Sequence, residues 1–264
     1  MIKNFDRTLN DQWLKNNLDY IMQVKTKYGP LYLLKNDRYI TQSFKENRYW
    51  GENEVLIIND FLKFRNKKKP TYLDIGSNIG SHILAISYLF NHDINIFSFE
   101  PQTYVFNLLK ANLFENNLNN VNFYNKAVSD KNEILEIKIL NHKKNNNFGG
   151  LELITPKISD NHDLEFLDKT EKIETIKLDS FIETDVDFIK MDIEGMEHLA
   201  IKGAMEIIKK NKPVLLIELK KTEINQILNF FREEEYSAYF IKGGNGLFVP
   251  NYMGVQIKNL ERIL

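Results

Sequence analysis

From Pro70 onward, short apolar runs alternate with segments whose apolar residues recur at helical spacing. This alternation is typical of an α/β fold, in which crossover helices join parallel strands. In the last helical segment, for example, Ile224, Ile227 and Phe231 recur at i, i+3 and i+7. We predict helices that begin near Ile79, Thr103, Met196 and Glu223, and strands at "TYLDI", "INIFSF", "VNFYN", "VDFIKM" and "PVLLIEL".

The chain between Asp130 and Lys177 interrupts this alternation. "EILEIKIL" and "KIETIKL" are typical of strands, and an irregular polar insert separates them. Inserts of this kind often give a common fold its own substrate surface. Near the end of the chain, "YSAYFIKGGNGLFVP" predicts an antiparallel hairpin that turns between Gly243 and Gly246. We therefore expect an otherwise parallel sheet to finish with an antiparallel strand.

The residues before the first core strand predict an N-terminal extension, residues 1–69, ahead of one large domain, residues 70–264. The helical spacing in "NDQWLKNNLDYIMQVKTKYG" predicts a helix that starts behind Asn10 and ends near Gly29. "LYLLKNDRYITQ" predicts a hairpin that turns at Asn36 and Asp37. A further helix is expected over residues 52–64. The aromatic residues of "ENRYWGEN" suit either core packing or a lid over a site, and we favour packing.

Composition narrows the class of protein. With 264 residues and 43% hydrophobic residues, the chain can bury a sizeable core. A formal net charge of −1 supplies no electrostatic reason to expect a nucleic-acid partner. The absence of cysteine excludes disulfides, thiolate metal sites and a cysteine nucleophile. Because no apolar stretch approaches the roughly 20 residues of a membrane span and no signal core is present, we expect a soluble, cytoplasmic protein.

The stretch "YLDIGSNIGSHI" places an acid and two glycines where a strand should end and a helix should begin. Ligands of parallel sheets bind at such strand ends, and Gly76 and Gly80 let the backbone approach a ligand closely. The dinucleotide fingerprint Gly-x-Gly-x-x-Gly is incomplete, because Asn78 and Ser81 take its second and third glycine positions. Asp74 suits a ligand that carries an ammonium group, such as the amino acid end of S-adenosylmethionine. A dinucleotide remains the alternative.

The next strand ends in Glu100, 26 positions after Asp74. An acid at this position can accept hydrogen bonds from both hydroxyls of a ribose. The alternative is a surface acid that caps the helix beginning near Thr103.

Six ordered blocks make the chain resemble the FkbM-type class I S-adenosylmethionine-dependent methyltransferases over residues 72–219. The blocks are "LDIGSNIG", "FSFEPQTYVFNLLKANL", "NKAVSD", "KLDSF", "DFIKMDIEGMEHLAIKGA" and "KPVLLIEL". The resemblance implies a Rossmann-like, seven-stranded sheet that is mostly parallel with an antiparallel last strand. It implies S-adenosyl-L-methionine as the cofactor.

The resemblance also implies the cofactor-binding residues. Asp74, Gly76, Asn78 and Gly80 would contact the methionine end, and Glu100 the ribose. Ala127 and Val128 would lie near the adenine, with Asp130 or Ser129 reaching its amino group. Ser77, Pro101 and Asp192 complete the predicted cofactor-binding set.

The block "FIKMDIEGMEH" supplies the candidate catalytic residues. Asp192 and Glu194 follow a central strand, so their side chains should lie at the cleft, although a polar strand end with a helix N-terminal charge would give the same pattern. An alkyl hydroxyl ionises poorly at neutral pH, so its methylation benefits from a nearby base. The candidates for this base are Asp192, Glu194 and His198; His198 also suits an ordinary half-buried histidine.

Glu218, at the end of the following strand, faces the same edge and is a candidate for substrate binding. Asp192, Glu194 and Glu218 could also hold a divalent cation, but no histidine constellation accompanies them and we predict no metal. No Asn/Asp-Pro-Pro-aromatic motif, which marks many N-methyltransferases, follows the strand at "MDIEG". This absence favours oxygen as the methyl acceptor, as the resemblance does.

We therefore predict an enzyme that methylates a hydroxyl on a sugar, glycan or related small molecule. One alternative is an NAD-dependent oxidoreductase, against which the missing middle glycine and the terminal hairpin both count. The other is a non-catalytic cofactor-binding domain.

Overall fold

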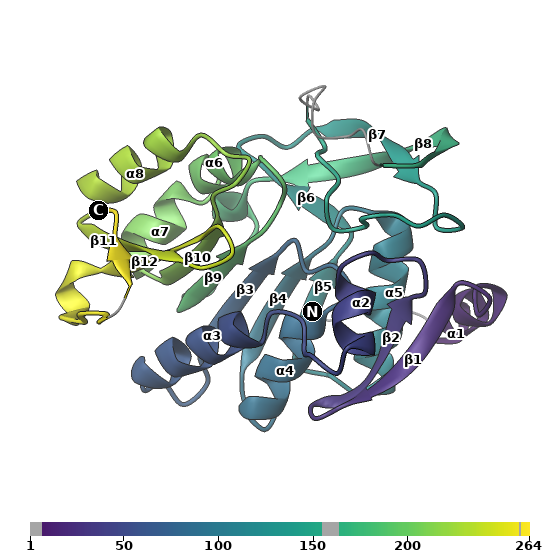
Figure 1. Ribbon diagram of the computed structural model, residues 1–264. Helices are drawn as coiled ribbons and strands as arrows, with labels where there is room; N and C mark the ends of the chain where they lie inside the picture. The colour runs from purple at the N-terminus through teal and green to yellow at the C-terminus, as the bar shows by residue number, and fades with distance from the viewer. Residues whose placement is uncertain (1–6, 155–163, 259) are drawn as a thin grey trace.

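A mixed eight-stranded sheet forms the centre of the computed structural model, which describes residues 7–154, 164–258 and 260–264. Its strand order is β13-β11-β12-β10-β9-β3-β4-β5 (Figure 1). The five strands predicted from apolar runs are confirmed and pair in parallel. They are β3 (Thr71–Ile75), β4 (Asn95–Phe99), β5 (Val121–Tyr124), β9 (Phe188–Met191) and β10 (Val214–Glu218).

Successive residues of the central strands enter two separate hydrophobic cores, one on each face of the sheet. In β3, Tyr72 belongs to one core and Leu73 to the other, as the alternation of side chains along a strand requires. The first core is closed by α3 (Glu52–Phe64), α4 (Ser81–Leu89) and α5 (Thr103–Glu115). The second is closed by α6 (Glu197–Lys202), α7 (Met205–Asn211) and α8 (Ile224–Glu233), so helices cover both faces (Figure 1).

The predicted terminal hairpin is confirmed as β11 (Tyr236–Ile241) and β12 (Asn245–Pro250). β12 lies between β10 and β11 and is antiparallel to both. The expected total of seven strands is one too low, because the two-residue strand β13 (Glu261–Arg262) pairs with β11 at the edge. Both residues of β13 are exposed, so no apolar pattern marks this strand in the sequence.

A second, three-stranded sheet lies beside the carboxyl ends of the central strands (Figure 1). It consists of β6 (Lys126–Val128), β7 (Ile134–Leu140) and β8 (Phe166–Ile176), and it confirms the two strands predicted between Asp130 and Lys177. Part of the predicted polar insert lies outside the described residues. The described residues also form two 3₁₀ turns, η1 (Leu178–Ser180) and η2 (Asn251–Met253).

The first predicted helix is wrong over its second half. Helix α1 (Arg7–Asn16) ends early, and the next residues form an antiparallel hairpin of β1 (Ile21–Thr26) and β2 (Gly29–Leu34). Buried Ile21, Leu31 and Leu33 pack into the core that α5 closes, and the Asn112 side chain of α5 accepts a 2.6 Å hydrogen bond from the Tyr32 N–H. Tertiary packing on α5 therefore overrides the local helical spacing.

The hairpin predicted at Asn36 and Asp37 is also wrong. Leu31 to Leu34 instead form the second strand of the preceding hairpin, and Asp37 begins helix α2 (Ile40–Lys45). The Asp37 carboxylate accepts the backbone N–H groups of Tyr39, Ile40 and Thr41 at 3.0, 2.6 and 3.1 Å. An aspartate can thus serve a helix start as well as a turn.

Helix α3 has the predicted bounds, 52–64, and residues before Pro70 share a core with the rest of the chain. Leu33 and Ile58 belong to the same hydrophobic cluster as Ile83 of α4 and Leu109 of α5. This shared packing brings the N-terminal elements close to the strand ends where the candidate site lies. No helix among the described residues is long and apolar enough to cross a membrane.

Candidate active site

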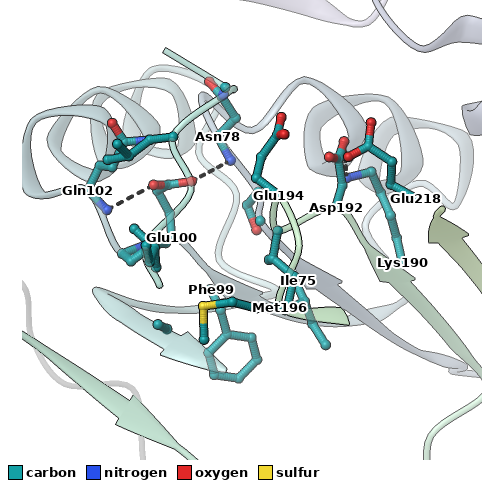
Figure 2. Close-up of a pocket in the computed structure, with 18 of the residues that line it drawn as sticks. Ile75, Asn78, Phe99, Glu100, Gln102, Lys190, Asp192, Glu194, Met196 and Glu218 are labelled. Carbon is teal, nitrogen blue, oxygen red and sulfur yellow. Dashed lines mark hydrogen bonds and ion pairs between the residues drawn. The ribbon is translucent and has the colours of Figure 1, made fainter. Parts of the chain in front are cut away.

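A cavity of about 370 Å³ opens at the carboxyl ends of the central strands (Figure 2). This volume falls within the roughly 300–1,000 Å³ common for small-molecule sites. Most of the residues predicted from the sequence line it: Gly76, Ser77, Asn78, Glu100, Pro101, Ala127, Val128, Asp192, Glu194 and Glu218. Asp74, Gly80 and His198 do not line it.

The turn after β3 brings its backbone against the turn after β9. Gly76 has a φ of 81°, and a Cβ there would lie 1.9 Å from the Asp192 carbonyl oxygen. Only glycine therefore allows these two strand ends to approach so closely. Gly80 plays a different part, because a Cβ at that position would collide with Leu109 of α5. It is a packing glycine between helices.

Asp74 lies beneath the cavity wall and is fully buried. Its Oδ1 is 3.7 Å from Nζ of Lys190, a buried lysine on the adjacent strand β9 that lines the cavity. Burial raises the pKa of Asp74, and the Lys190 charge opposes this effect. Lys190 was missed by the sequence analysis, since a charged residue inside an apolar strand gives no sign of its partner.

Glu100 joins the turn after β3 to the start of α5 from inside the cavity wall. Its two carboxylate oxygens accept the backbone N–H groups of Asn78, at 3.0 Å, and Gln102, at 2.9 Å (Figure 2). The side chain is buried, so Glu100 is no surface acid. Burial raises its pKa to about 7 against the opposing effect of the two N–H donors. Each oxygen retains a further lone pair for a ligand hydroxyl.

The wall next to Glu100 is apolar. Phe99, Ala127, Val128 and Met196 line it, and Phe99 stacks on Tyr124 with ring centroids 5.3 Å apart. Such a surface suits a flat, weakly polar group. Ser129 and Asp130, the two residues considered for an adenine contact, lie outside the wall.

Three carboxylates gather at the ends of β9 and β10. Asp192, Glu194 and Glu218 each present one oxygen within 4.8 Å of the others. Each also has a lysine partner: Lys190 is 3.4 Å from Asp192, Lys221 is 2.9 Å from Glu194 and Lys220 is 3.4 Å from Glu218. The Asp192 side chain is the most open of the three, with 42% of its surface exposed.

Glu218 has an unusual protonation state within this acidic group. Only 12% of its side chain is exposed. Burial, reinforced by the charges of Asp192 and Glu194, raises its pKa to about 8. Glu218 is therefore mainly a neutral acid near pH 7 and can donate a hydrogen bond.

Glu197 holds the loop that carries these acids, and sequence analysis missed it. Its carboxylate accepts the N–H groups of Ile193 and Gly195, both at 3.0 Å, in the manner of a helix cap. His198, the next residue of α6, is half-buried and stays outside the cavity wall.

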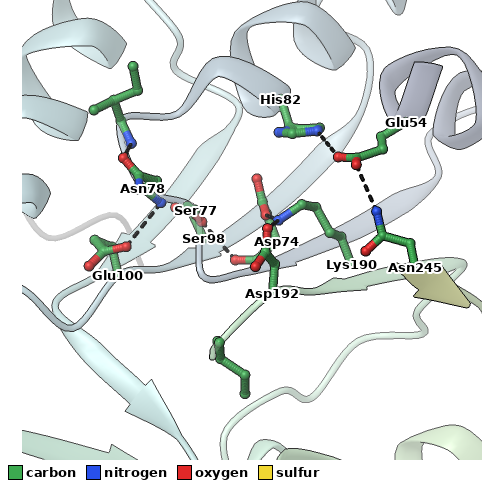
Figure 3. A network of polar contacts seen from close by, with 12 residues as sticks. Glu54, Asp74, Ser77, Asn78, His82, Ser98, Glu100, Lys190, Asp192 and Asn245 are labelled. Atoms are coloured by element: carbon green, nitrogen blue, oxygen red, sulfur yellow. Dashed lines mark hydrogen bonds and ion pairs between the residues drawn. The ribbon is translucent and has the colours of Figure 1, made fainter. Parts of the chain in front are cut away.

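The N-terminal elements complete the wall. Tyr39 and Trp50 line the cavity together with His82 of α4. His82 Nε2 is 2.8 Å from Glu54 of α3, and Glu54 accepts a 2.8 Å hydrogen bond from Asn245 of β12 (Figure 3). The sequence had marked the "ENRYWGEN" aromatics for packing, so the position of Trp50 in the cavity wall is a finding of the tertiary structure.

Comparison with known families identifies the chain. Residues 74–238, more than half of its length, match the family described as "Methyltransferase FkbM domain". The chain belongs to the FkbM methyltransferase family. This membership confirms the resemblance and favours methyl transfer over the NAD-dependent oxidoreductase considered from the sequence.

Several solved structures of methyltransferases are similar to this chain. An FkbM methyltransferase from Methylobacillus flagellatus KT matches with a TM-score of 0.50 and 17% identity, over 69% of this chain and 43% of that one. This chain thus spans less than half of that protein. A SAM-dependent O-methyltransferase from Thermotoga maritima gives 0.44 and 10% identity, covering 87% and 77%. An rRNA methylase from Streptococcus thermophilus gives 0.43 and 8% identity, covering 74% and 92%. No curated protein matches the chain.

FkbM methyltransferases use S-adenosylmethionine, and the cavity residues fit this cofactor. The buried Glu100 carboxylate retains acceptor capacity for ribose hydroxyls. The apolar wall beside it suits adenine, and Gly76, Ser77 and Asn78 of the turn after β3 line the cavity where the methionine end would lie.

Proposed function

We propose that this FkbM methyltransferase transfers a methyl group to a hydroxyl of a sugar, a glycan or a related small molecule. The observation that carries this proposal is the presence of two acids with different surroundings in the cavity wall. Asp192 is open to the cavity and paired with Lys190, whereas Glu218 is mainly neutral near pH 7. One acid can accept a proton while the other donates a hydrogen bond, which suits an oxygen nucleophile.

We assign the cofactor-binding residues from the places that they take in the cavity wall. Gly76, Ser77 and Asn78 would hold the methionine end of S-adenosylmethionine, with Asp74 and Gly80 supporting that turn from outside the wall. The ribose would bind at Glu100 and Pro101, and the adenine at Ala127 and Val128.

When bound, S-adenosylmethionine supplies an electrophilic methyl group. Asp192 takes the hydroxyl proton as the acceptor oxygen gains the methyl group, and Glu218 orients that oxygen. Holding both reactants in line supplies much of the rate, because orientation can contribute roughly 7–11 kcal/mol. Glu194 is the second candidate for the base, although its 2.9 Å pair with Lys221 engages its carboxylate. His198 is the third, and it lies outside the wall.

The test begins with methyl-labelled cofactor and a panel of glycans, small alcohols and RNA, followed by identification of the methylated atom. With the acceptor in hand, Asp192→Asn should lower the single-turnover rate by about 10²-fold or more, the usual worth of a positioned base. S-adenosylhomocysteine affinity, measured by calorimetry, should change much less. A methyl group found on nitrogen or on RNA would overturn the proposal, and a near-normal rate would move the base to Glu194 or His198.

A further inference from the structure

A second cavity, of about 600 Å³, adjoins the first on the side of the N-terminal elements. We call it the acceptor groove. It lies between the segment that runs from α2 into α3 and the end of β11. Tyr39 and Trp50 line both cavities, so these two aromatic side chains form the boundary between them. The other residues of the acceptor groove are Arg38, Gln42, Ser43, Asn47, Arg48, Tyr49, Gly51, Glu52, Asn53, Glu54, Ile241 and Lys242.

The backbone on both sides of Trp50 is firmly held. On one side, the Tyr49 hydroxyl donates a 2.7 Å hydrogen bond to the Ser81 carbonyl at the start of α4. On the other side, Gly51 has a φ of 69° and no room for a side chain, because a Cβ would lie 2.4 Å from His82 Nε2. The indole is therefore presented at a defined position, and within the described residues its N–H makes no hydrogen bond.

The acceptor groove combines aromatic rings with planar polar side chains. Tyr39 is 54% exposed, and Trp50 is half-buried, with part of its surface packed against the main hydrophobic core. Gln42, Asn47 and Asn53 add amide groups that both donate and accept hydrogen bonds. A sugar ring needs both features, because its C–H face packs on aromatic rings while its hydroxyls require donors and acceptors. The wall carries charges of both signs, since Glu52 and Glu54 accompany Arg38, Arg48 and Lys242, and RNA is therefore included in the test below.

We propose that the acceptor groove binds the saccharide part of the methyl acceptor, with Trp50 as the stacking platform. The sugar hydroxyl passes the Tyr39–Trp50 boundary into the cofactor cavity, next to the His82–Glu54 pair that joins the two walls. This inference rests on the proposed function only in taking a saccharide as the acceptor.

The chain offers a direct optical test, since Trp13 and Trp50 are its only tryptophans. Trp13→Phe leaves Trp50 as the single reporter, and Trp50→Phe is the matched control that keeps only Trp13. Trp13 lies on α1 and packs edge-on against Tyr104, away from both cavities. Binding of S-adenosylhomocysteine, followed by thermal shift, verifies that each variant is folded.

Both variants are titrated with methyl glucoside, methyl galactoside, N-acetylglucosamine, rhamnose and cellobiose, and with a ten-nucleotide RNA. We expect a saturable change in Trp50 emission with at least one sugar and no change in the Trp50→Phe control. Silence with every sugar, or a response to RNA alone, overturns the inference. In turnover assays Trp50→Ala should raise the acceptor KM about tenfold more than Trp50→Phe does; equal KM values count against stacking.

The two proposals fail in different ways. If the enzyme methylates a sugar hydroxyl but that sugar does not change Trp50 emission, the assignment of the acceptor groove is wrong and the proposed function stands. If Trp50 responds to a sugar but the methyl group is found on nitrogen, the groove stands and the proposed O-methylation fails.

Discussion

At the scale of single residues, the environment of Glu100 makes cofactor binding depend on pH. Its pKa is raised to about 7, mainly by burial. In the proposed ribose site, the ionised carboxylate above that pH would accept hydrogen bonds from two ribose hydroxyls, whereas below it one oxygen carries a proton and becomes a donor. Affinity for the cofactor should therefore rise with pH through this range.

We expect the Kd of S-adenosylhomocysteine to fall by up to about tenfold between about pH 6 and about pH 8, the span over which a group with a pKa near 7 ionises. Isothermal calorimetry at several pH values measures this change. Glu100→Gln should bind more weakly and lose most of the pH dependence. An unchanged profile in Glu100→Gln would assign the titration to another group.

Glu218 should determine how kcat/KM depends on pH on the alkaline side of the optimum. Its pKa of about 8 arises from burial and from the charges of Asp192 and Glu194. As the pH rises through this value, Glu218 loses the proton with which it binds the acceptor oxygen, so kcat/KM should fall. In Glu218→Gln, whose amide keeps a donor and does not ionise, the alkaline decline should flatten. A decline of the same shape in the variant would contradict this role.

At the scale of elements, a partly buried polar link joins α3, α4 and β12. Glu54 lies between His82 and Asn245, each at 2.8 Å (Figure 3). Burial alone would raise the pKa of Glu54, but the hydrogen bond and charge of His82 prevail and lower it from 4.5 to about 2. Because the folded-state pKa is depressed, this link stabilises the fold above about pH 4.5, and the benefit is lost as the pH falls toward 2.

We expect Glu54→Gln to lower the free energy of unfolding by about 1–3 kcal/mol at pH 7, measured by urea denaturation. The difference from the natural chain should shrink as the pH falls from about 4.5 toward 2, where the natural chain loses the same charge. Glu52→Gln is the matched control on the same helix. The exposed ion pair between Glu52 and Lys27 should contribute less than about 1 kcal/mol to the free energy of unfolding. Equal losses in the two variants would show that burial of Glu54 adds nothing.

At the scale of the whole molecule, the cavity should discriminate between two adenosine cofactors. S-adenosylhomocysteine at 100 times its Kd should stabilise the protein by about 2.7 kcal/mol, a clear thermal shift. NAD should give no shift, because Asn78 stands at the middle glycine position of the dinucleotide turn and donates its N–H to Glu100. Equal shifts with both ligands would contradict the assignment of the cavity.

The central sheet could be predicted because the hydrophobic side chains of its strands indicate by themselves that these strands are buried. Strands buried on both faces, such as "TYLDI" and "PVLLIEL", are mainly apolar, so local pattern and tertiary position agree. The hairpin of β1 and β2 could not be predicted in this way. The spacing of apolar residues up to Gly29 suits a helix as well as a strand, and packing on α5 decides between them.

The same distinction applies to the candidate site. The positions of Gly76, Glu100, Asp192 and Glu218 follow from the sequence, because parallel strands place the residues after their carboxyl ends along one edge. The contributions of Trp50, His82 and Lys190 follow only from the tertiary structure. Their partners are distant in the chain, as in the approach of Glu54 to Asn245, and no local pattern records which distant segments will meet. The sequence by itself determined which residues lie at the carboxyl edge of the sheet, where the cofactor site is expected. Tertiary packing decided which residues from the N-terminal elements and neighbouring strands complete the cavity.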